Sequence, residues 1–85
     1  MLEAAFYYEQ QSGGLGKDFL NKVQSAVDDI VQHPTRWPKA RASIRRRLVH
    51  RFPYVILYEN QSQEVLIVAV MHLRRHPNYW IGRAP

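Results

Sequence analysis

The first third of the chain has the hydrophobic periodicity of two α-helices. In the range 2–11, Leu2, Ala5 and Phe6 fall on one helical face and polar residues on the other. In the range 15–33, apolar residues recur at three- and four-residue spacing. Gly-rich residues 12–16 separate the two stretches, and Pro34 ends the second. Because the joint is short, the pattern predicts an antiparallel helical hairpin.

After a loop over 34–42, the period changes to two. The range 44–52 places apolar residues on one parity and arginines on the other, which predicts a strand with an apolar face and a basic face. The ranges 52–59 and 64–71 predict two more strands, separated by a polar turn over 60–63. Because the last strand is almost uniformly apolar, we expect it to be central or covered on both faces. The short links favour an antiparallel meander.

Helices followed by strands indicate an α+β fold. We expect one domain over residues 1–85, with an N-terminal antiparallel helical hairpin packed on a C-terminal three-stranded antiparallel sheet. The sequence does not show which strands form the edges of this sheet. An exposed edge can accept a strand from another chain.

Composition narrows the classes of partner and site. The chain has 85 residues, no Cys and a net charge of +5, which excludes a disulfide scaffold and favours an anionic partner. No apolar run approaches a membrane span, and the N-terminus lacks the pattern of a signal peptide, so we expect a cytoplasmic protein. No histidine pair has the spacing with carboxylates that a metal site needs, so neither a metal nor another cofactor is expected.

The arginines form two groups along the chain. The first group belongs to the first predicted strand and the second to the end of the third; they are Arg45, Arg46, Arg47 and Arg51, and Arg74 and Arg75. Strand ends distant in the chain can meet at one end of a meander, where guanidinium groups bind phosphate or carboxylate bidentately. Any single arginine here could belong to a solvated face. For the group together, we expect one shared anion-binding hollow, since dense like charges repel.

The segment 72–80 combines bases with aromatic side chains. His72 follows the last strand and could serve as a general acid or base, or as a structural histidine bonded to backbone. Tyr79 and Trp80 could stack on a base or anchor a protein partner. The alternative is packing against the sheet, which we favour for Trp80. The acidic residues are scattered, which argues against two-metal nuclease chemistry.

Several motifs occur in order along nearly the whole chain. They are Glu3–Glu9, Gly14–Phe19, His33-Pro34, Trp37-Pro38, Ile44–Arg46, Arg51–Tyr54 with Tyr58, Val68–His72, Arg74-Arg75 and Pro77–Trp80. In this order and spacing, the chain resembles the RelE/ParE superfamily of type II toxin–antitoxin toxins, on its ParE-like, plasmid-stabilisation side.

The resemblance implies a growth-inhibiting toxin that a cognate antitoxin wraps and blocks. An acidic, partly disordered antitoxin would complement the basic charge of this chain. ParE-like toxins inhibit DNA gyrase, and RelE-like toxins are metal-independent endoribonucleases that cut mRNA on the ribosome. Whether this chain is an enzyme therefore stays open. A third possibility is a non-toxic nucleic-acid-binding module of the same fold.

Each function assigns roles to particular residues. Binding of gyrase or nucleic acid would use Arg45, Arg47, Arg51, Arg75 and Trp80. In a ribonuclease, His72 or Tyr79 would take the proton of the 2′-hydroxyl, while Arg46 or Arg74 would stabilise the charge that develops on phosphorus.

Members of the superfamily usually begin with a short strand before the first helix. In this chain Met1 lies almost at the start of the first predicted helix, so we expect that strand to be missing. Its absence would leave one sheet edge unpaired. We expect an antitoxin strand or a second copy in a homodimer to cover that edge.

Overall fold

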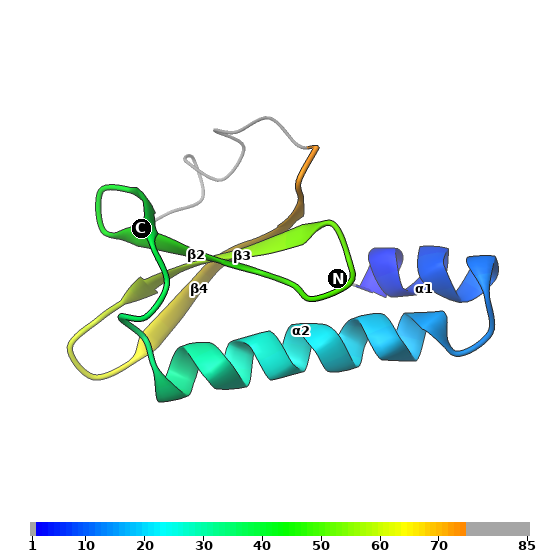
Figure 1. Cartoon of the computed structure of the whole chain (residues 1–85), viewed down its shortest axis with the longest axis horizontal. Helices are drawn as coiled ribbons and strands as arrows, with labels where there is room; N and C mark the ends of the chain where they lie inside the picture. The colour runs from blue at the N-terminus through cyan, green and yellow to red at the C-terminus, as the bar shows by residue number, and fades with distance from the viewer. Residues whose placement is uncertain (1, 75–85) are drawn as a thin grey trace.

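A computed structural model describes residues 2–74, in which two helices precede an antiparallel sheet (Figure 1). The elements in chain order are α1 (Leu2–Gln11), α2 (Leu15–Gln32), β1 (Lys39–Arg41), β2 (Ile44–Leu48), β3 (Tyr54–Asn60) and β4 (Val65–His72). The α+β fold and the helical hairpin are confirmed. The sheet has four strands among the described residues, where three were expected.

The joint between the helices depends on Gly14 and on the side chain of Glu9. Gly14 has φ 87°, a left-handed conformation that glycine adopts without steric cost, and it provides no side chain to cap α2. Glu9 of α1 takes that role. Its Oε2 accepts the Gly14 N–H at 2.9 Å, and its Oε1 accepts the Gly16 N–H at 3.0 Å. The first amides of α2 thus find partners, and the carboxylate lies at the positive end of the helix dipole.

The apolar stripe of α2 packs on one face of the sheet. Phe19, Val23, Ala26 and Ile30 are all buried, at the spacing that one helical face requires. The helix runs along the sheet, whereas α1 lies beside the end of the sheet that carries the β2–β3 turn (Figure 1).

The sheet is a meander with the order β1-β2-β3-β4. Strand β3 pairs on both sides and has four consecutive buried residues, 55–58. Strand β4 pairs only with β3 among the described residues, so the prediction of a central position is wrong. Its apolar run arises because it contributes to both faces: Val70 packs with the helices, while Ala69 and Met71 are buried on the opposite face.

Strand β1 lies within the segment that we expected to be a loop. Its three residues are all exposed and show no alternation that would identify a strand. Pairing of Lys39 with Arg45, and the 3.0 Å hydrogen bond from the Arg46 N–H to the Pro38 carbonyl oxygen, hold it beside β2. Strands β1 and β4 are therefore the two edges of the described sheet.

Candidate functional site

Arg45 is held against the loop that follows α2. Its Nη1 donates to the carbonyl oxygen of Trp37 at 2.7 Å, and the side chain is half-buried. It pairs across the strands with Tyr58, whose hydroxyl donates to the Pro34 carbonyl oxygen at 2.8 Å. Burial raises the pKa of Tyr58, and nearby Arg45 opposes that rise. This arginine therefore ties the sheet to the loop.

Arg47 faces α2 and is paired within the chain. Its Nη2 lies 2.8 Å from Oδ2 of Asp29, and its Cζ lies 5.0 Å from the ring centroid of Trp37. Only 20% of the Arg47 side chain is exposed. Neither Arg45 nor Arg47 belongs to a solvent-exposed basic face, so that expectation for the first predicted strand is corrected. Their parity faces the helices because Asp29, Trp37 and the aromatic rings of the core accept the cationic groups there.

Arg46 points to the other face of β2. It is exposed, and its alternate neighbours are the buried Ile44 and the exposed Leu48. Three consecutive arginines of one strand therefore project to two sides of the sheet. The expectation that this whole group shares one hollow with the second arginine group is not met.

Two other basic residues share one end of the sheet. Arg51, with φ 73°, lies in the β2–β3 turn, and Arg74 follows β4; both are exposed. The Leu73 N–H donates to the Pro53 carbonyl oxygen at 2.9 Å, which holds the two turns side by side. Together with His72, these arginines form a surface that we call the basic end.

The geometry of His72 determines what its ring can do. The ring packs edge-on against Tyr54, with centroids 5.2 Å apart, and Nδ1 accepts the backbone N–H of Arg74 at 3.0 Å. A nitrogen that accepts a hydrogen bond carries no proton, so the neutral ring carries its proton on Nε2. In this arrangement neither nitrogen offers a free lone pair to a substrate hydroxyl. The structural alternative considered for His72 has this kind of backbone bond.

An aromatic cluster supports the basic end from below. Tyr8 of α1 lies 4.8 Å from the Phe52 ring and 6.4 Å from the Tyr54 ring, measured between centroids. Burial, with Tyr54 and Tyr7 adding to it, raises the pKa of Tyr8, so its hydroxyl stays protonated at neutral pH. The position of His72 is thus fixed by rings that come from both the helices and the sheet.

Three candidate residues, Arg75, Tyr79 and Trp80, lie outside the described residues. Within 2–74, no group of three His, Asp or Glu side chains could hold a metal ion. No helix in the same range is long and apolar enough to span a bilayer. Two pockets lie away from the arginines, one between α1 and α2 and one beside the β3–β4 turn.

Sequence reasoning missed two residues that determine this geometry, Glu9 and Asp29. Asp29 directly precedes Ile30 of the buried stripe, so its place at the margin of that stripe could have indicated a partner on the sheet. Glu9 is close enough in sequence to the glycine joint to cap a helix that starts without Ser, Thr, Asp or Asn.

Comparison with known proteins agrees with these motifs. A family model described as ParE toxin of type II toxin-antitoxin system, parDE, matches residues 2–77. No curated protein matches the chain.

Proposed function

Because this chain belongs to the ParE toxin family of type II toxin–antitoxin systems, we propose that it inhibits bacterial growth through DNA gyrase and that a cognate antitoxin neutralises it. The observation that carries the proposal is the family match over residues 2–77, which includes nearly every motif quoted above. ParE-like members of the superfamily are the ones whose target is gyrase.

The basic end is the surface that we assign to the target. Arg51 and Arg74 are exposed, and no carboxylate among residues 2–74 forms an ion pair with either. Arg45 and Arg47, by contrast, already have partners within the chain. A guanidinium group free of internal partners can bind an acidic surface bidentately, so Arg51 and Arg74 are better candidates than the buried pair.

Ribosome-dependent mRNA cleavage is the alternative within the superfamily. It needs a base for the 2′-hydroxyl, and His72 has its Nδ1 occupied by the Arg74 amide. This geometry favours a binding role for the basic end over a catalytic one. A non-toxic nucleic-acid-binding module would use the same charges, but it would not arrest growth.

The free edge of β4 is a second proposed contact. Strand β4 has eight residues without a charge or a proline, whereas β1 has three residues, two of them basic. Charges and short length protect an edge from pairing, so β4 is the edge that we expect an antitoxin strand or a second copy to cover. Amide hydrogen exchange over 65–72 with and without the antitoxin tests this. A monomer whose β4 edge is already fully protected would refute it.

Induction of the chain in a bacterium, with and without the neighbouring open reading frame, tests the proposed function. We expect growth arrest with a DNA-damage response, and rescue when the neighbour is expressed. The double variant Arg51→Ala/Arg74→Ala should relieve the arrest, whereas Arg41→Ala, an exposed arginine of β1, should not. Translation arrest without DNA damage would instead assign the chain to the ribonuclease branch. No arrest would leave the non-toxic module.

A further inference from the structure

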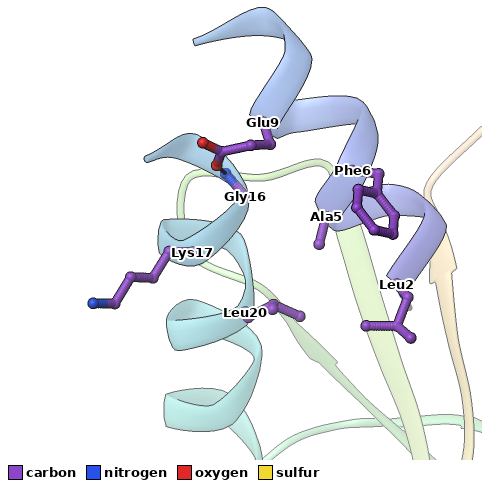
Figure 2. A pocket seen from close by; sticks show the side chains of 7 residues that line it. All are labelled: Leu2, Ala5, Phe6, Glu9, Gly16, Lys17 and Leu20. Carbon is purple, nitrogen blue, oxygen red and sulfur yellow. Dashed lines mark hydrogen bonds between the residues drawn. The ribbon is translucent and has the colours of Figure 1, made fainter. Parts of the chain in front are cut away.

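An apolar groove runs between the two helices, on the outside of the hairpin (Figure 2). Its volume is about 280 Å³, and residues of both helices line it: Leu2, Ala5, Phe6, Glu9, Gly16, Lys17 and Leu20. Nothing in the proposed contact with gyrase uses these residues.

The groove combines a floor of small residues with apolar walls. Gly16 lets α2 approach α1 closely, since a Cβ there would overlap the Ala5 carbonyl oxygen. Leu2 and Phe6 are each 68% exposed, and Leu20 is 37% exposed. Large apolar side chains that stay in water along one line are typical of a surface that a partner covers.

The charges around the groove indicate the sign of that partner. Both carboxylate oxygens of Glu9 accept backbone amides of the joint, so the negative charge is compensated within the hairpin. Lys17 forms no ion pair with the other described residues, and its side chain extends away from α1 (Figure 2). The groove therefore has apolar walls with an uncompensated ammonium group at its rim.

We infer that this groove docks an amphipathic helix of the acidic antitoxin, an inference that rests on the proposed function. Two antiparallel helices leave a channel along which a third helix packs with residues at i, i+3, i+4 and i+7. A carboxylate beside that apolar stripe would pair with Lys17. A second copy of the chain is the weaker occupant, because it would bring another Lys17 and a further net charge of +5 to the interface.

Binding of the purified chain to the product of the neighbouring open reading frame, measured by calorimetry, tests the inference. We expect Phe6→Ser and Leu20→Ser each to raise the Kd about tenfold or more, as loss of a central apolar contact does. Lys17→Glu should weaken binding and reduce its dependence on salt. The matched control is Val31→Ser, since Val31 is 60% exposed on α2 but lines the other pocket.

Circular dichroism establishes that each variant is folded, and hydrogen exchange of the complex gives a second measurement. We expect added protection over 2–20 when the partner is bound. If the wild-type chain binds but Phe6→Ser and Leu20→Ser bind equally well, the groove inference is overturned and the proposed function stands. If the wild-type chain does not bind, both are overturned. Self-association that Phe6→Ser abolishes would also overturn the inference, because it assigns the groove to a second copy.

Discussion

Replacement of Gly16 by Ala tests whether close contact between α1 and α2 stabilises the molecule. A Cβ at this position would overlap the Ala5 carbonyl oxygen and would lie 3.0 Å from Oε1 and 3.1 Å from Cβ of Glu9. The Ala5 contact is with backbone, so rotation of a side chain cannot relieve it. We expect α1 to move away from α2 and the hydrogen bond from the Gly16 amide to Glu9 to be lost.

The magnitude follows from three opposing effects. Ala is a better helix former than Gly by about 1 kcal/mol, which favours the variant. Overpacking costs about 1–3 kcal/mol, and loss of a hydrogen bond to a charged group costs about 1.5–3 kcal/mol. The net loss in the free energy of unfolding is therefore about 2–4 kcal/mol, which lowers the Tm of a domain of this size by roughly 10–20 °C.

Urea denaturation followed by circular dichroism measures the change. The control is Gly13→Ala, because a Cβ on Gly13 meets nothing within 4 Å. We expect this control to stay within about 1 kcal/mol of the wild type. If Gly16→Ala were as stable as the wild type or more so, close helix contact would not be a source of stability, and the account of the hairpin would be wrong.

Three further predictions concern single side chains. Tyr58→Phe removes a buried hydrogen bond and should cost about 1 kcal/mol. Burial raises the pKa of Tyr58 above its ordinary value of 10.0, so the unfolded chain ionises first. Wild-type stability should thus fall as the pH rises past 10.0, and an equal fall in Tyr58→Phe, in urea titrations across that range, would contradict this. Asp29→Asn removes the partner of the Arg47 guanidinium and should cost about 0.5–1 kcal/mol, less at high salt; a salt-independent loss in thermal melts would argue against an ion-pair effect. A side-chain hydrogen bond from Gln61 is the main cause that lowers the pKa of Glu59, so its stabilising effect should be complete at neutral pH and be lost as the pH falls through that lowered pKa. Acid titration of Glu59→Gln should therefore show a shallower loss of stability, and an unchanged acid limb would refute the assignment.

The helices could be predicted from sequence because their apolar residues recur on one face. The buried stripe from Phe19 to Ile30 keeps one spacing along α2, and Pro34 follows the helix end closely. The turn at 60–63 and the antiparallel pairing of the main strands followed in the same way from polar links and short connections. These features are local, so the chain near each residue determines them.

The position and partners of the arginines could not be predicted in this way. Alternation along β2 separates Arg46 from Arg45 and Arg47, but it does not show which face meets the helices. We assigned the basic parity to solvent, whereas Asp29 and Trp37 receive Arg47 on the inner side. Long-range neighbours of this kind depend on how α2 and its following loop pack on the sheet.

Strands at the edges were difficult for a related reason. Strand β1 is too short for alternation to be visible, and it depends on pairing with β2. Strand β4 has the apolar composition of a central strand because both of its faces contribute to apolar clusters. Burial of faces and hydrogen bonding of edges are independent, and composition reports only the first.

Inhibition of gyrase-catalysed DNA supercoiling by the purified chain is the most direct test of the proposed function. The account predicts inhibition by the wild-type protein and by Arg41→Ala, loss of inhibition in Arg51→Ala/Arg74→Ala, and reversal when the antitoxin is added. Normal supercoiling at a large molar excess of the folded wild-type chain would contradict it.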